Sequence, residues 1–186
     1  MADPASTFAA VGALATGAGA LVTGVGAFVA LLAFRKNVEW KKAELASNYL
    51  KELLSNQELV FACRCIDWRA GKLVVPEQLR PLLPNEAKVI EHDYRLLERA
   101  LDPRLGIAEM ATEPRLQLYR TAMDGLLSWI NLVDNAIGRR LFGAREMPEM
   151  RYWLARIRET VWIAPFAETF GYSQALQRMN RAFRLT

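Results

Sequence analysis

Cys63, Cys65 and His92 are the residues of this sequence best suited to metal binding or covalent catalysis. The chain holds only two Cys and one His, which is a small supply of zinc ligands and nucleophiles. Residues two apart on a helix point to different faces, so these thiols do not converge on one ion. No Ser or Cys stands at a nucleophile elbow near the His92-Asp93 pair, and no glycine-rich phosphate loop lies outside residues 8–34. We therefore expect no catalytic residue, no metal, no cofactor and no small-molecule substrate, and two reduced, buried thiols.

A second set of candidate residues is basic. Arg178, Arg181 and Arg184 recur every three residues, and no acid follows Glu168. This spacing predicts one basic stripe on a helix, and guanidinium groups pair well with phosphates. Anionic headgroups, RNA or an acidic partner could bind such a stripe, and the alternative is a solvated helix face at the chain end. The block from Arg139 to Arg158 is mixed with the acids Glu146, Glu149 and Glu159, and we interpret it as ordinary surface.

The longest feature of the sequence is an uncharged, mainly apolar run from Phe8 to Phe34. As a helix these residues would extend roughly 40 Å, against a hydrocarbon core of about 30 Å. A cleaved signal peptide is the alternative, but no basic residue precedes the run and Arg35-Lys36 follow it directly as a stop-transfer pair. The sequence thus predicts a transmembrane segment within residues 1–36.

Basic residues on one side of this segment predict its orientation. Arg35, Lys36, Lys41 and Lys42 follow the run closely, whereas the only charged side chain before it is acidic. The positive-inside rule then places residues 37–186 in the cytoplasm and the N-terminus outside, as expected for a single-pass protein of the inner membrane. Trp40 would mark the interface, where indole rings settle.

Small residues give this segment two seams along its length. One seam combines Ala13, Gly17, Ala20, Gly24 and Ala27, and the other combines Gly12, Thr16, Gly19, Thr23 and Gly26. Small seams let helices approach closely in lipid, and two seams allow two neighbours, which favours a homo-oligomeric ring larger than a dimer. In such a ring the hydroxyls of Thr16 and Thr23 would face the axis, and Arg35 and Lys36 would surround the cytoplasmic mouth and disfavour cations. The alternative is an Ala/Gly-rich anchor with no lumen.

Beyond the membrane segment the patterns are helical, so we predict an all-α fold whose transmembrane helix continues into a cytoplasmic helical bundle. No stretch keeps a sustained two-residue alternation. The predicted helices run from the membrane segment through Leu54, from the Ser55/Glu58 capping box to Gly71, from Asn85 to Asp102, from Thr112 to Gly138, and in two shorter pieces after Pro148, the last interrupted near Gly171.

Three short motifs carry a resemblance to a known group of proteins. They are Val38-Glu39-Trp40-Lys41-Lys42-Ala43-Glu44 after the basic pair, then Ile66-Asp67-Trp68, and Arg151-Tyr152-Trp153-Leu154. With one N-terminal span and a helical domain, the chain resembles the membrane accessory proteins of type VI-B CRISPR systems. That resemblance implies pore assembly in antiviral defence and an RNA-guided effector as partner. It also implies a degenerate HEPN-like domain, but Asn85, Glu86 and Ala87 stand where a HEPN nuclease would carry its Arg before the His, so no nuclease activity is carried over.

Two functional hypotheses of different classes follow. The leading one is a non-enzymatic membrane protein that assembles through Gly12, Thr16, Gly17, Gly19, Thr23 and Gly24 into a ring or pore. The second is a membrane-tethered adaptor that recruits a cytoplasmic protein or nucleic acid through a basic surface such as the stripe from Arg178 to Arg184. A membrane-bound enzyme is a third possibility, for which the sequence offers no convergent polar cluster.

Overall fold

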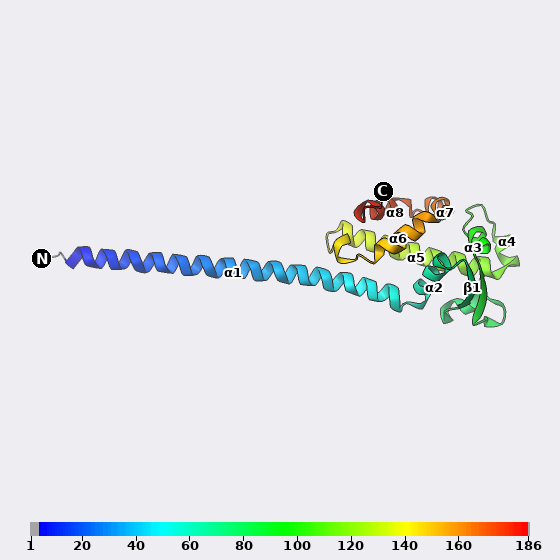
Figure 1. Cartoon of the computed structure of the whole chain (residues 1–186), viewed down its shortest axis with the longest axis horizontal. Coiled ribbons are helices and arrows are strands. Elements are labelled where there is room, and N and C mark those ends of the chain that lie inside the picture. Colours follow the sequence, from blue (N-terminus) through cyan, green and yellow to red (C-terminus); the bar gives the residue numbers. More distant parts are fainter. Residues whose placement is uncertain (1–3, 186) are drawn as a thin grey trace. The chain divides into compact units, whose positions relative to one another are not determined.

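The computed structural model describes the backbone of residues 4–185 and the side chains of residues 28–185. The chain forms two compact units, Met1–Lys42 and Ala43–Thr186. Helix α1 (Pro4–Ser55) supplies the described part of the first unit and the beginning of the second (Figure 1). Among the residues that the structure describes, no helix carries an apolar stretch long enough to span a membrane.

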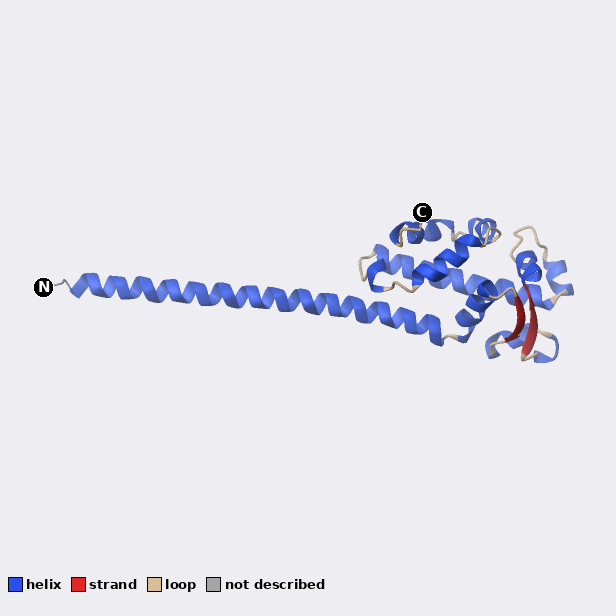
Figure 2. Ribbon diagram, viewed as in Figure 1, coloured by secondary structure: helices blue, strands red, loops and turns tan. Residues whose placement is uncertain are grey.

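The remaining elements all belong to the second unit, which is a mainly helical domain. Figure 2 shows helices packed on one another with a single hairpin beside them. In chain order the elements are α2 (Gln57–Asp67), β1 (Ala70–Val74), η1 (Glu77–Leu82), η2 (Pro84–Glu86), β2 (Val89–Asp93), α3 (Tyr94–Ala100), α4 (Ile107–Thr112), α5 (Pro114–Gly138), η3 (Ala144–Glu146), α6 (Met150–Glu159), α7 (Ile163–Thr169) and α8 (Ser173–Ala182).

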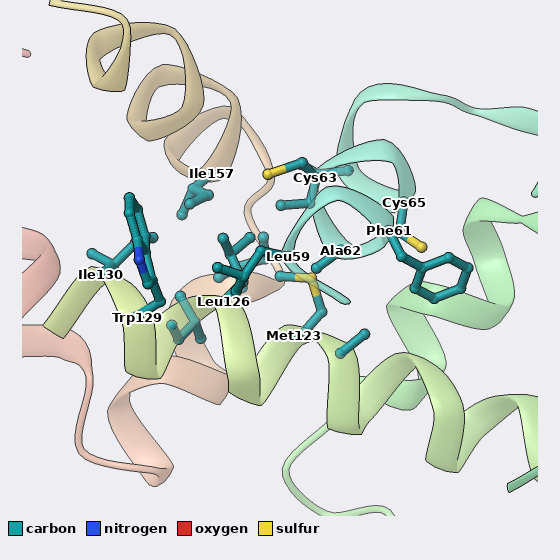
Figure 3. Packing of buried hydrophobic residues seen from close by; sticks show 14 of the residues in the cluster. Leu59, Phe61, Ala62, Cys63, Cys65, Met123, Leu126, Trp129, Ile130 and Ile157 are labelled. Carbon is teal, nitrogen blue, oxygen red and sulfur yellow. The ribbon is translucent and has the colours of Figure 1, made fainter. Parts of the chain in front are cut away.

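Helix α5 is the centre of this domain, as its long apolar period predicts. It contacts α2, α3, α4 and α8. Its apolar positions recur at helical spacing and are buried: Leu116, Tyr119, Met123, Leu126, Leu127, Ile130 and Val133. The apolar face of α2, which includes Leu59 and Ala62, packs on α5 near Met123 and Leu126 (Figure 3). The main core is therefore formed between these two helices.

The end of α1 is fixed to the same core by a few contacts. Ala46 and Leu53 are fully buried, and the ring of Tyr49 packs on that of Phe142 with centroids 5.3 Å apart. Nε1 of Trp129 donates a hydrogen bond of 3.3 Å to the carboxylate of Glu52. Residues 43–55 are thus part of the domain itself.

The hairpin is the main departure from the predicted all-helical fold. Strands β1 and β2 pair antiparallel, from Ala70 opposite Asp93 to Val74 opposite Val89. Along β2 the side chains of Ile90 and His92 are buried and their neighbours are exposed, which is the two-residue alternation of a half-buried strand. The predicted helix from Asn85 to Asp102 is wrong for residues 85–93, which precede α3. Asn85 has a φ of 54° and cannot act as a helix N-cap.

Several helix ends also differ from the predicted ones. Asn56, rather than Ser55, caps α2 by accepting hydrogen bonds from the backbone of Glu58 and Leu59. Glu113, rather than Thr112, caps α5, while Thr112 ends the short helix α4, which was not predicted. The predicted interruption near Gly171 is confirmed, because Gly171 adopts a φ of 84° that few other residues tolerate and separates α7 from α8.

Candidate functional site

The two cysteines are buried parts of the core. Both thiols are free, and they point in different directions from α2 (Figure 3). Burial raises the pKa of Cys63 to about 12 and also raises the pKa of Cys65, because an apolar environment disfavours the thiolate. Among the described residues, no group of three His, Cys, Asp or Glu side chains is placed to hold a metal ion. The arrangement gives these thiols a packing role.

His92 is a hydrogen-bonded core residue that joins three segments. Its Nε2 lies 2.8 Å from the carbonyl oxygen of Trp68, and its Nδ1 lies 2.9 Å from the hydroxyl of Tyr119. Since a carbonyl can only accept, Nε2 carries the proton, and Nδ1 accepts from the Tyr119 hydroxyl. The backbone N–H of Asp93 donates to the same hydroxyl oxygen at 3.4 Å. Burial lowers the pKa of His92 and raises that of Tyr119, so both groups stay neutral.

The three arginines of the predicted basic stripe have different partners in the structure. Arg178 donates from Nε and Nη2 to one carboxylate oxygen of buried Asp134 on α5, at 2.9 and 2.5 Å. Arg181 is exposed, and its Nε donates to the carbonyl of Gln177. Arg184 lies beyond the end of α8 with a φ of 54°. Thus Arg178 fixes α8 to the central helix, and the three guanidinium groups have different surroundings.

Arg184 instead lies with Arg145 and Arg151, for which the mixed charges of the sequence predict an ordinary surface. Arg145, Arg151 and Arg184 line a cavity of about 400 Å³, with Pro148 and Phe183 among its apolar walls. Among the described residues, no acidic side chain lines this cavity. We call it the basic cavity. Two segments that are distant in sequence, residues 144–151 and 182–184, form it, so spacing alone gives no signal for the grouping.

A second concave site lies along α5 between α4 and α7. It has a volume of about 510 Å³ and is lined by Ile107, Met110, Ala111, Gln117, Arg120, Thr121, Asp124, Phe166 and Phe170. We call it the Arg120 groove. The guanidinium of Arg120 lies 5.6 Å from the ring centroid of Phe166 and 4.9 Å from that of Phe170. Both distances are within the range of cation–π attraction.

The guanidinium of Arg120 has only weak polar partners in the described part of the chain. Its Nη1 lies 3.4 Å from the carbonyl of Leu105 and 3.6 Å from the sulfur of Met110, and no carboxylate forms an ion pair with it. The nearby carboxylate of Asp124 accepts a hydrogen bond of 2.7 Å from the hydroxyl of Tyr172. Ile107 at the rim is 83% exposed. The groove therefore combines an apolar surface with one half-buried cation that forms no ion pair with any carboxylate in the described part of the chain.

Two of the motifs that carry the resemblance contact one another. The hydroxyl of Tyr152 donates to a carboxylate oxygen of Asp67, and Nε of Arg156 lies 3.2 Å from the same oxygen. Nη1 of Arg156 also pairs with Glu159 at 2.9 Å. This polar cluster joins the end of α2 to α6. Its side chains are partly or largely exposed, which is typical of a structural surface network.

Most residues predicted for a ring or pore precede residue 28, at which the described side chains begin. Gly12, Thr16, Gly17, Gly19, Thr23 and Gly24 belong to α1, but their side-chain surroundings lie outside the described residues. Arg35 and Lys36 are exposed, as are all the side chains of residues 28–41. Large apolar groups are among them, with Phe34 66% and Trp40 72% exposed.

Comparison with known proteins gives this chain no relative. No protein-family model, no curated protein and no solved structure matches it.

Proposed function

We propose that this protein is a non-enzymatic, membrane-anchored adaptor whose helical domain binds a segment of another protein in the Arg120 groove. The observation that carries the proposal is the guanidinium of Arg120, which lies on two aromatic rings without a carboxylate partner among the described residues. An unpaired, half-buried cation is costly unless a counter-ion completes it. A bound anionic group would supply that counter-ion.

The anchor is inferred from the first helix. The uncharged run from Phe8 to Phe34 lies on α1, and the basic residues from Arg35 to Lys42 follow it. Exposed apolar groups such as Phe28 and Phe34 in the described part of α1 support this inference, since large apolar side chains cost free energy in water. In this proposal the protein is a single-pass protein of the inner membrane, with the domain in the cytoplasm.

The surface of the groove indicates the chemistry of its occupant. Phe170 and Ile107 offer exposed apolar contact, and Arg120 in the same groove offers a planar donor for a carboxylate. The best complement is a short protein segment with an Asp or Glu beside a large apolar side chain. The apolar side chain would contact the phenylalanines, and the carboxylate would pair with Arg120.

The adaptor proposal can be tested by photo-crosslinking the full chain in cells. A benzophenone amino acid at Ile107 should give one adduct of defined mass, and Arg120→Gln should lower its yield about tenfold, because a charge-assisted hydrogen bond is lost. Arg104→Gln is the matched control, since Arg104 is an exposed arginine paired with Asp102 and lies outside the groove. The same probe at exposed Leu132 on α5 controls for random capture.

An adduct that is insensitive to Arg120→Gln, or one formed equally at Leu132, would contradict the adaptor proposal. The adduct should also persist when residues 8–34 are replaced by an unrelated Leu-rich span, because an adaptor needs the anchor only for attachment. Circular dichroism and the thermal midpoint of each variant would exclude unfolding as the cause of a loss.

A second candidate function is a pore, which the two small-residue seams of residues 12–27 favour. The resemblance to CRISPR membrane accessory proteins would then place it in antiviral defence, beside an RNA-guided effector. Vesicles that contain the full chain and a self-quenched dye distinguish the two functions. Dye release that Gly17→Leu and Gly24→Leu abolish would support a pore, whereas intact vesicles would support the adaptor.

A further inference from the structure

The basic cavity collects three guanidinium groups, and Arg145 alone among them has a carboxylate partner in the described part of the chain. The side chain of Arg145 is 89% exposed and lies 3.5 Å from the carboxylate of Glu146. Arg151 and Arg184 are exposed, and neither forms an ion pair among the described residues. Like charges that converge on one concave surface repel one another, so an anion bound between them is stabilised.

The nearby acid, Glu146, is already occupied by the backbone. One of its carboxylate oxygens accepts a hydrogen bond of 2.8 Å from the N–H of Gly143, and its side chain is only 19% exposed. Its other oxygen makes the long contact with Arg145. Glu146 therefore shapes the loop that carries Arg145 and does not line the cavity itself.

Local structure holds the other two arginines at the cavity wall. Arg151 lies in the first turn of α6. Arg184 follows the end of α8 in a turn that two backbone hydrogen bonds close, from the N–H of Arg184 to the carbonyl of Arg181 and from the N–H of Leu185 to that of Asn180. The wall beside them is apolar and includes Phe183 and Pro148. A tetrahedral anion attached to an apolar body fits this combination.

The position of the cavity in the domain favours a lipid as the source of that anion. The loop after α5 carries both Arg145 and Phe142, and Phe142 packs on Tyr49 of α1. Tyr49 follows Arg35 by only 14 residues along the chain. Two further arginines, Arg139 and Arg140, begin the same loop. Basic groups that a short chain tethers to a bilayer bind its anionic lipids.

We propose that the basic cavity binds the phosphate group of an anionic phospholipid through Arg145, Arg151 and Arg184. The inference rests on the membrane anchor of the proposed function, and it adds a second contact that limits the motion of the helical domain above the bilayer. The apolar wall beside Phe183 receives the glycerol and upper acyl part of the lipid.

Native mass spectrometry of the full chain in mild detergent tests this inference. Phosphatidylglycerol and phosphatidylcholine are the probes, added separately at equal concentration. The wild-type chain should retain phosphatidylglycerol about tenfold better, and the double variant Arg151→Gln/Arg184→Gln should lose that preference. The matched control, Arg104→Gln/Arg181→Gln, removes the same charge from exposed positions outside the cavity and should keep it.

The remaining outcomes separate the sources of the anion. If inorganic phosphate displaces phosphatidylglycerol at equal concentration, the cavity binds free phosphate and the lipid proposal is overturned. An equal loss in the control variant would show general charge attraction and would also overturn it. Carbonate extraction tests separately whether residues 8–34 anchor the chain in the membrane. A failure of the anchor can therefore be distinguished from a failure of the basic cavity to bind lipid. Unchanged thermal midpoints confirm that both variants fold.

Discussion

The hydroxyl of Tyr119 in the centre of α5 lies 2.9 Å from Nδ1 of His92 on β2, and this contact joins the hairpin to the central helix. The same hydroxyl oxygen accepts a hydrogen bond from the backbone N–H of Asp93. Both residues are buried, with Tyr119 fully inaccessible. Loss of the hydroxyl would therefore leave a buried acceptor and a backbone donor without their partner.

Tyr119→Phe should lower the free energy of unfolding by about 1–3 kcal/mol, the usual cost of unsatisfied buried polar groups. Urea unfolding of the full chain in detergent, followed by tryptophan fluorescence, measures it. Tyr152→Phe is the matched control, because Tyr152 is half exposed and its hydroxyl bonds to Asp67 at the surface. Equal effects of the two substitutions would argue against a structural role for the buried contact.

Stability should also depend on the protonation of His92. Burial lowers its pKa in the fold, whereas the unfolded chain takes up this proton near pH 6.5. The contribution of the neutral imidazole is thus fully present above pH 6.5 and is lost as the pH falls below it. We expect a lower urea midpoint at pH 5.5 than at pH 7.5.

The His92→Gln variant controls for other titrations in this experiment. The chain has one histidine, so the variant should lose most of the change between pH 7.5 and pH 5.5. If the variant keeps the full pH dependence of the wild type, other groups cause it.

The thiols of Cys63 and Cys65 should react slowly in the folded chain. Both are buried, and the raised pKa of each leaves little thiolate at pH 8. Labelling with an aromatic disulfide reagent, followed by the absorbance of the released thiolate, should be at least about tenfold slower than the labelling of free cysteine. In urea both thiols should react rapidly. Rapid labelling without urea would mean that α2 does not pack as described.

Self-association through α1 can be tested with Gly17 and Gly24. Replacing both by Leu would separate the helix backbones and should reduce the protein mass of the detergent-extracted particle to that of one chain. Ser6→Leu and Thr7→Leu, just before the apolar run, provide a control of similar size. An unchanged particle mass in the glycine variant would remove the seam from the assembly.

The sequence predicts the helical elements that have long apolar periods. The period from Leu116 to Val133 predicts α5 and its central place, and Gly138 predicts its end. The hairpin is missed because β2 has only five residues, and an Asn-Glu pair before them imitates a helix start. Pairing with Leu73 and the contact with Tyr119 determine that strand, and neither is local in sequence.

The candidate sites are less predictable, because long-range packing forms them. The spacing of Arg178, Arg181 and Arg184 indicates a common stripe, but buried Asp134 binds Arg178. Arg184 meets Arg145 and Arg151 only after α5, α6 and α8 have packed. Arg120 has no distinguishing neighbour in the sequence. Its proposed role depends on Phe166 within α7 and on Phe170, which caps the C-terminus of α7.

The proposed function requires that residues 8–34 hold this protein in a membrane. Sodium carbonate extraction of membranes from cells that express the full chain tests this requirement directly, because it removes peripheral proteins and leaves transmembrane ones. The chain should stay in the carbonate-washed membranes and enter solution only with detergent. Its release by carbonate, or its recovery in the soluble fraction, would contradict the anchor and with it the proposed adaptor.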